Sequence, residues 1–171
     1  MTTPAESLQK PVITALLVAT ERHGVMLELP AVQVKTGAGI VGDRFFSRSV
    51  RHPERNITLI EAEAIAAAAA ILGMPIPLHA PRRNLVTRGI SLNNLVGKTF
   101  RVGPVLLRGM ELCEPCVVLG RNLETAALPR EAIIRAFLHR GGLRATVLCD
   151  GVIRQGDVID LPDTVPAGMP L

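Results

Sequence analysis

The chain has 171 residues, a length that predicts a single domain with a core of its own. Its composition is 48% hydrophobic and 20% charged, which excludes a disordered chain. The most apolar run, residues 65–78, is shorter than the roughly 20 residues of a membrane helix and contains glycine and proline, so we expect no membrane partner. Because the first residues lack the basic start and apolar core of a secretory signal, we expect a cytoplasmic protein.

The net charge of +4 is carried almost entirely by arginine, since the chain contains only three lysines. A guanidinium group suits phosphate and carboxylate ligands. We expect a general bias toward Ala, Arg, Gly and Pro to be the main cause of the arginines. The chain has no Trp or Tyr and only four Phe to stack on bases, so we do not expect a nucleic-acid partner.

The first part of the chain predicts strands and a glycine-rich loop. Residues 1–11 are expected to form a flexible arm, and the branched apolar run 12–19 predicts a buried strand. A second strand over 25–34 is interrupted at Pro30. The three glycines within residues 35–44 indicate a turning loop.

Two helices are predicted among further short strands. Alanines and an early acidic turn predict a helix over 61–72 that ends at Gly73, and Pro129 predicts the first turn of a helix that runs to about residue 139. Asp150-Gly151 predicts a β-hairpin. The remaining predicted strands are residues 56–60, 82–87, 100–102, 105–113, 143–149 and 152–161.

Short strands that do not alternate regularly with helices favour a mostly β fold with helical insertions (α+β) over a doubly wound sheet. We therefore predict one domain over residues 12–161, followed by a proline-rich tail over 162–171.

The three cysteines are expected to be reduced thiols, because an odd number argues against a disulfide scaffold. Cys113-Glu114-Pro115-Cys116 places two of them three residues apart after a predicted strand. Such a pair can bind metal, carry sulfur or cycle through a disulfide, and it can also be two packed side chains. A zinc site needs more ligands at set spacing. A thioredoxin-like motif opens a helix, which the strand-rich context does not favour.

Two further motifs are rich in polar side chains. If Arg82-Arg83-Asn84 begins a strand, its arginines point to opposite faces, and the motif is either an anion site or a surface ion pair. In Gly42-Asp43-Arg44 the glycine allows close approach of a ligand, although a plain turn explains it too. His139-Arg140-Gly141-Gly142 is explained as a helix end.

The order of these motifs resembles the MOSC domain family, which is related to the C-terminal domain of molybdenum cofactor sulfurase. The resemblance covers residues 12–161 and is most specific in RRNLVTRGI and CEPC. The segments that carry it are Gly42-Asp43, 56–61 (NITLIE), 82–90 (RRNLVTRGI), 97–103, 113–116 (CEPC) and 144–157.

The resemblance implies a β-barrel akin to the barrel domain of pyruvate kinase and a link to molybdenum cofactor (molybdopterin). It implies that Cys116 is a molybdenum ligand or a persulfide carrier, which Cys113 protects or resolves. The anionic end of the cofactor is expected near Arg82, Arg83 and Asn84, where the two arginines would hold phosphate. Asp43 and Asn84 are expected to orient the ligand, and Arg44 is expected to be a further cofactor-binding residue.

A stand-alone MOSC domain needs a separate partner, either a sulfur donor such as a cysteine desulfurase or a redox protein. Some relatives with electron-carrying parts reduce N-hydroxylated compounds. The alternative is a sulfur-trafficking or protein-interaction barrel without bound cofactor.

Overall fold

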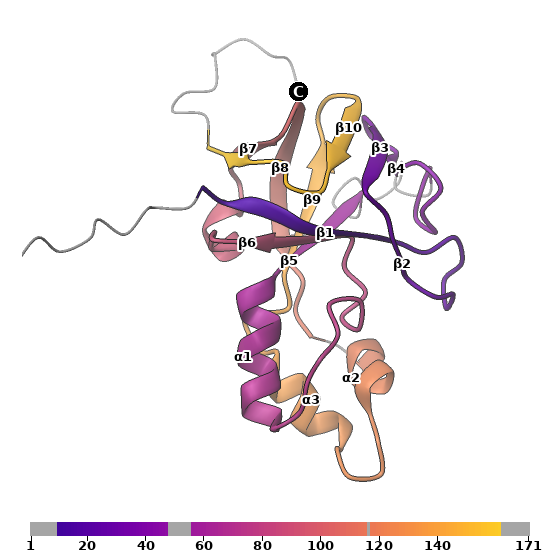
Figure 1. The fold of residues 1–171 in the computed structure, drawn as a ribbon, viewed down its shortest axis with the longest axis vertical. Coiled ribbons are helices and arrows are strands. Elements are labelled where there is room, and N and C mark those ends of the chain that lie inside the picture. Colours follow the sequence, from indigo (N-terminus) through magenta and orange to yellow (C-terminus); the bar gives the residue numbers. More distant parts are fainter. Residues whose placement is uncertain (1–9, 48–55, 116, 162–171) are drawn as a thin grey trace, which may run out of the picture.

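The computed structural model describes residues 10–47, 56–115 and 117–161, and it consists mostly of strands (Figure 1). The strands are β1 (Val12–Val18), β2 (Leu27–Glu28), β3 (Ala31–Lys35), β4 (Gly39–Ile40), β5 (Ile57–Glu61), β6 (Leu85–Arg88), β7 (Thr99–Val102), β8 (Val105–Leu112), β9 (Leu143–Val147), β10 (Gly151–Arg154) and β11 (Ile159–Asp160). The helices are α1 (Ala62–Leu72), α2 (Val117–Leu123), α3 (Arg130–Ala136) and a 3-10 turn over Leu92–Leu95. This is the mostly β fold with helical insertions that the sequence predicts.

Eight strands form one curled sheet in the order β11-β7-β8-β9-β5-β6-β1-β2, and β10-β3-β4 form a second, smaller sheet. Among the strands of the described residues, only β5 and β6 pair in parallel, because α1 crosses over between them. At the far end the sheet returns to β1: Val12 forms a bridge with Val158, and the amide of Ile13 donates to the carbonyl of Asp157 at 2.9 Å. The sheet therefore curls into a barrel.

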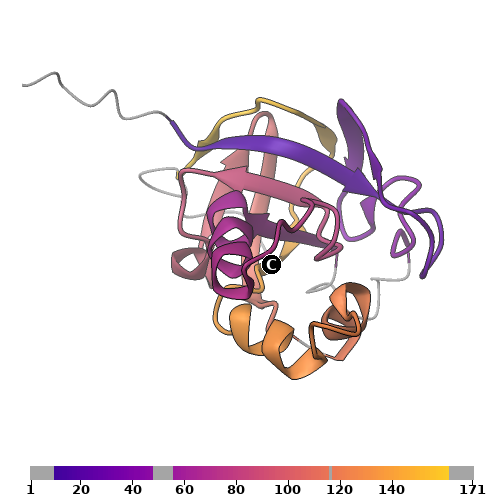
Figure 2. The same ribbon diagram turned by 60° about the horizontal axis from the view of Figure 1, so that its bottom comes forward.

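Both faces of β1 are buried, which explains its continuous apolar sequence. Leu16 and Val18 belong to the core inside the barrel, whereas Ala15 and Leu17 pack in a second core against the helices. The helices gather on one side of the barrel (Figure 2). The second core also contains Phe137, which is fully buried.

The prediction of the alanine-rich helix is confirmed. Helix α1 spans Ala62–Leu72, and Gly73 ends it in the left-handed conformation with φ of 66°. The second predicted helix is confirmed but is shorter, over Arg130–Ala136 after Pro129. Helix α2 was not predicted from the sequence.

The hairpin predicted at Asp150-Gly151 is wrong. β9 pairs with β5 and β8, whereas β10 pairs with β3 in the second sheet. The Asp150 carboxylate instead accepts hydrogen bonds from the amide of Thr36 at 2.8 Å and from Lys35 Nζ at 2.9 Å. These bonds direct the chain towards β3, so residues that look like a two-residue turn connect two sheets.

Candidate functional site

Residues 82–84 precede β6 and do not belong to it, which corrects the strand predicted over 82–87. Arg82 has φ of 57°, a left-handed conformation that breaks extended structure in a non-glycine residue. The two arginines therefore do not alternate across a strand as predicted. Leu85 is the first residue of the strand, and the segment before it directs three consecutive side chains to different surroundings.

Asn84 lies inside the protein, with 2% of its surface exposed. Its Nδ2 donates to the carbonyl of Leu17 at 3.1 Å and to Asp43 Oδ1 at 3.2 Å. Its Oδ1 accepts from the Thr58 hydroxyl at 2.9 Å and from the Thr58 amide at 3.3 Å. Every hydrogen-bonding position of the amide is thus engaged within the protein. Sequence reasoning missed Thr58, although it lies within the NITLIE segment.

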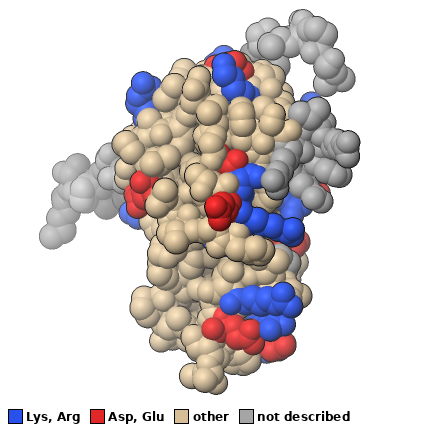
Figure 3. All heavy atoms as spheres, turned by 90° about the vertical axis from the view of Figure 1, so that its right-hand side faces the viewer, with Lys and Arg blue, Asp and Glu red and all other residues tan. Residues whose placement is uncertain are grey.

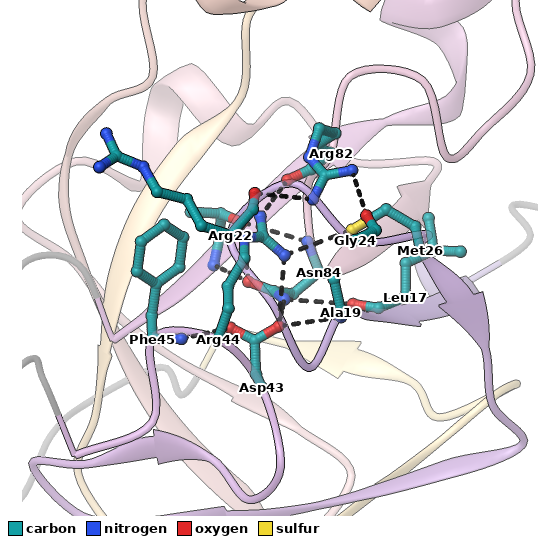
Figure 4. A network of polar contacts seen from close by, with 11 residues as sticks. Leu17, Ala19, Arg22, Gly24, Met26, Asp43, Arg44, Phe45, Arg82 and Asn84 are labelled. Atoms are coloured by element: carbon teal, nitrogen blue, oxygen red, sulfur yellow. Dashed lines mark hydrogen bonds and ion pairs between the residues drawn. The ribbon is translucent and has the colours of Figure 1, made fainter.

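Asp43 is the centre of a network that joins the end of β1, the loop after β4 and the start of β6 (Figure 4). Its Oδ1 accepts from the amide of Ala19 at 3.3 Å as well as from Asn84, and its Oδ2 accepts from the amide of Phe45 at 3.0 Å. Arg44 Nη1 lies 3.4 Å from Oδ1. This buried carboxylate therefore holds backbone amides and a guanidinium in place together.

Arg44 is also buried, with 9% of its surface exposed. Besides its ion pair with Asp43, its Nη2 donates to the carbonyl of Arg82 at 3.1 Å and its Nη1 to Met26 Sδ at 3.3 Å. Its guanidinium lies 4.7 Å from the centre of the Phe45 ring. Arg44 thus holds the backbone of the 82–84 segment through its bond to the carbonyl of Arg82.

The guanidinium groups of Arg82 and Arg83 point in different directions. Arg82 Nη1 donates to the carbonyl of Gly24 at 2.8 Å and its Nη2 to that of Arg22 at 3.1 Å. Arg83 Nε donates to the carbonyl of Gly141 at 2.9 Å. Both side chains are half-buried, and within the described residues neither forms an ion pair with a carboxylate.

These arginines leave an excess of positive charge around one carboxylate. Burial lowers the pKa of Arg44, which Asp43 opposes, and the nearby charges of Arg82 and Arg83 lower it further. The charges of Arg82 and Arg83 thus both act on Arg44, and Asp43 is the only carboxylate paired with any of the three arginines in the described part of the chain. Such an excess favours an anionic ligand.

The cysteine motif begins directly after β8. Cys113 is buried, and its amide donates to the carbonyl of Gly142 at 2.7 Å. Burial raises the pKa of the Cys113 thiol; the charges of Arg83 and Arg144 oppose this, and Glu111 adds to it. Cys113 is therefore a shielded thiol whose protonated form is favoured by its burial. Arg144 is a neighbour that the sequence did not reveal.

Cys116 lies outside the described residues. The chain enters α2 at Val117, so the CEPC motif connects the end of a strand with the beginning of a helix. This local setting was not predicted from the sequence. It is the connection in which redox-active cysteine pairs occur, although the surrounding fold is a barrel.

The surface near Arg82 has a shallow hollow of about 200 Å³ lined by His79, Ala80, Arg82 and Asn122. Basic side chains on the face drawn in Figure 3 lie in separate groups, most of them beside acidic ones. Among the described residues, the basic side chains on that face therefore form no continuous surface of the kind that nucleic acids bind. Among the residues that the structure describes, no three His, Cys, Asp or Glu side chains are grouped to hold a metal ion.

None of the helices, within the described ranges, is both long and apolar enough to cross a membrane.

Comparison with solved structures finds the same fold in several proteins of low sequence identity. YuaD from Bacillus subtilis is 21% identical with a TM-score of 0.76, and the match covers 87% of this chain and 94% of that one. YiiM from Geobacillus stearothermophilus is 18% identical with a TM-score of 0.69, covering 90% and 75%. YiiM from Escherichia coli is 16% identical with a TM-score of 0.61, covering 90% and 70%.

The search of curated proteins found no match. The family model described as MOSC domain matches residues 42–160, which is more than half of the chain and includes the arginine segment and the cysteine motif. Together with the curled barrel and its helical insertions, this match establishes that the chain belongs to the MOSC domain family.

Proposed function

We propose that this chain binds molybdenum cofactor in the cytoplasm, with Arg82 and Arg83 at the anionic end and Cys116 as the molybdenum ligand or as a persulfide carrier. The MOSC family is associated with binding of this cofactor. The proposal extends that association to particular residues of this chain. A reducing compartment suits its free thiols.

The excess of positive charge at residues 82–83 is the observation that carries the proposal. Arg44 is neutralised by Asp43, but Arg82 and Arg83 have only backbone carbonyls as partners among the described residues. A phosphate-bearing ligand would supply the missing negative charge and use the remaining N–H groups. The donor set therefore fits the anionic end of the cofactor.

Asp43 and Asn84 orient the ligand indirectly in this proposal. Their polar atoms are bonded to Arg44 and to the backbone, so they fix the position of the segment that carries Arg82 and Arg83. Charged side chains keep their geometry when a ligand binds if the residues that support them already have all their hydrogen-bond partners within the protein.

Cys116 follows the buried Cys113 and supplies the soft thiolate that molybdenum or sulfane sulfur requires. When bound, the cofactor would supply redox chemistry, such as reduction of N-hydroxylated compounds with electrons from a separate redox protein. Cys113 protects Cys116 or resolves it.

Sulfur carriage without the cofactor is the second candidate. The hollow at Arg82, about 200 Å³, is smaller than the roughly 300–1,000 Å³ typical of small-molecule sites, which favours a small group over a large ligand. In this version the Cys116 thiolate attacks the outer sulfur of a persulfide on a donor such as a cysteine desulfurase. The donor leaves as a thiolate, and Cys116 becomes the persulfide.

The proposal is tested by measuring molybdenum per chain after anaerobic purification from a host that makes the cofactor. Cys116→Ala is compared with Cys149→Ala, whose thiol contacts Leu106 at the opposite end of β8. The double variant Arg82→Gln/Arg83→Gln is compared with Arg101→Gln/Arg108→Gln, which removes the same charge from exposed strand positions.

We expect near-stoichiometric molybdenum in the wild type and in both controls, and its loss in both test variants. Wild-type protein without molybdenum would overturn cofactor binding. A mass increase of one sulfur that disappears in Cys116→Ala would then establish sulfur carriage, and its absence would leave the interaction-only barrel.

A further inference from the structure

The turn formed by residues 139–142 lies directly against the cysteine motif. A Cβ atom on Gly141 would lie 1.9 Å from the carbonyl oxygen of Cys113 and 3.2 Å from the nitrogen of Pro115. No side chain fits in that space, so only glycine allows the two backbones to approach this closely. The sequence explained Gly141 as the end of a helix, but its surroundings give it a second role.

The other side of the turn rests on the barrel. Gly142 has φ of 104°, and a Cβ atom there would lie 2.0 Å from the carbonyl oxygen of Leu59 in β5. The Gly142 carbonyl accepts the amide of Cys113 at 2.7 Å. The turn is thus wedged between a central strand and the cysteine motif, with backbone contacts on both sides.

Arg83 connects the same turn to the arginine segment. Its Nε donates to the carbonyl of Gly141 at 2.9 Å, and its Nη1 donates to the carbonyl of Pro81 at 3.2 Å. One guanidinium therefore spans the two backbones on which the arginine site and the cysteine motif depend.

Two contacts of His139 hold the beginning of the turn. Its Nδ1 lies 3.6 Å from Glu114 Oε1, within the CEPC motif, and its carbonyl accepts from Asn93 Nδ2 at 3.0 Å. The side chains of His139 and Glu114 are both exposed, so this contact is weaker than the backbone packing of Gly141.

We propose that the 139–142 turn is the positioning element of the cysteine motif and that Arg83 is the positioning residue that fixes this turn. The idea that this position serves to hold molybdenum or sulfur on Cys116 rests on the proposed function. The packing of the turn against the cysteine motif does not depend on that function. A reacting thiol needs a defined place relative to its ligand, and displacements of about 1 Å can cost about a hundredfold in rate.

Gly141→Ala tests the packing directly. The added methyl group pushes the Cys113 carbonyl away, so the buried Cys113 thiol is expected to react with iodoacetamide about tenfold faster, and loading of molybdenum or persulfide is expected to fall. Site-specific alkylation is followed by mass spectrometry of the native, metal-free protein. Stability is measured in parallel by urea denaturation.

Gly109→Ala is the matched control. Gly109 lies in β8, and a Cβ atom on it would lie 2.1 Å from the carbonyl oxygen of Leu95 in the 3-10 turn, a similar clash with backbone at a position outside the cysteine motif. We expect a loss of stability without selective exposure of Cys113 and without loss of loading in the folded fraction. Equal effects of the two variants at equal stability would overturn the proposal.

Arg83→Gln is the second test, and it applies even if Gly141→Ala fails to fold. Burial raises the pKa of the Cys113 thiol and the charge of Arg83 lowers it, so removal of the charge alone would slow alkylation. Release of the turn would speed it. Faster alkylation in Arg83→Gln therefore supports positioning, and slower or unchanged alkylation overturns it for Arg83.

The two proposals fail in different ways. If wild-type protein carries neither molybdenum nor persulfide but Gly141→Ala still exposes Cys113, the positioning role stands and the proposed function falls. If wild type is loaded and Gly141→Ala is loaded equally with Cys113 still shielded, the positioning role falls.

Discussion

Asn84 and Arg83 are neighbours in the chain, yet they belong to two regions that are stabilised differently. On the barrel side, Asn84, Asp43 and Arg44 are buried and bonded to one another or to backbone. On the cysteine side, the half-buried Arg83 holds the carbonyl of Gly141, and packing against glycine takes the place of a polar network. A substitution on the barrel side leaves buried groups unpaired, whereas one on the cysteine side exposes groups to water or moves a loop.

This difference separates stability from function within one motif. Buried polar groups that lose a partner pay their full desolvation cost, but half-exposed groups regain bonds with water. We therefore expect barrel-side substitutions to appear mainly in the free energy of unfolding. Cysteine-side substitutions are expected to appear mainly in ligand loading and thiol reactivity.

Asp43→Ala is expected to have the largest effect on stability. It leaves the buried Arg44 without its counter-charge and two backbone amides without an acceptor, which costs about 3–5 kcal/mol. Urea denaturation measures the loss. Asp43→Asn removes the charge and keeps one acceptor oxygen, but it replaces the other oxygen with an NH2 donor, so we expect a loss that is smaller than that of Asp43→Ala and still measurable. A loss below about 1 kcal/mol for Asp43→Ala would mean that this network contributes no more to stability than an exposed ion pair does.

Asn84→Ala is expected to follow, with a loss of about 2–3 kcal/mol, since it removes the Nδ2 donor to the carbonyl of Leu17 and the Oδ1 acceptor of the Thr58 hydroxyl. Thr58→Val removes one of those groups. The double variant should therefore lose less than the sum of the single variants. Additive losses, measured by the same denaturation experiment, would contradict a shared network.

The sequence predicted the elements whose signals are local. The helix over 62–72 follows from its alanines and from Gly73, which adopts the left-handed φ expected at a helix end. Asp43, Arg44 and Asn84 were chosen for their residue types and their order along the chain, and the structure brings them together. Their roles as cofactor-binding residues stay predictions.

Elements that depend on distant partners could not be predicted. Asp150-Gly151 has the residues of a tight hairpin, but the carboxylate bonds to Thr36, which is 114 residues away in the sequence. Gly141 looked like a helix end because nothing in the sequence shows that Cys113 lies against it. Arg82 and Arg83 were assigned to a strand because periodicity does not reveal a left-handed residue at its start.

Arg82→Gln and Arg83→Gln are expected to have smaller effects on stability, about 1 kcal/mol each, because both side chains are half-buried and donate only to backbone carbonyls. Each should nevertheless reduce molybdenum loading. A variant that loses about 3 kcal/mol or more would show that its arginine belongs to the fold in the same way as Asp43. Urea denaturation and elemental analysis on the same preparations separate the two outcomes.

The smallest expected effect is a pH dependence at Cys113. Burial, reinforced by Glu111 and opposed by Arg83 and Arg144, raises the pKa of this thiol above its ordinary value of 9.0 in the folded protein. The unfolded chain therefore loses its proton first as pH rises. The stability that Cys113 contributes is complete below about pH 9 and declines as pH rises towards the folded pKa.

Above about pH 9, the free energy of unfolding of the wild type should accordingly fall relative to that of Cys113→Ala. The difference should grow by at most about 1.4 kcal/mol per pH unit. Cys149→Ala, which keeps Cys113, should follow the wild type. Parallel curves of unfolding free energy against pH for wild type and Cys113→Ala would mean that the thiol ionises equally in the folded and the unfolded state. Cys113 would then be as accessible to water as a surface thiol. A divergence confined to the alkaline range would place Cys113 with the buried barrel residues, although its neighbours are the half-exposed arginines.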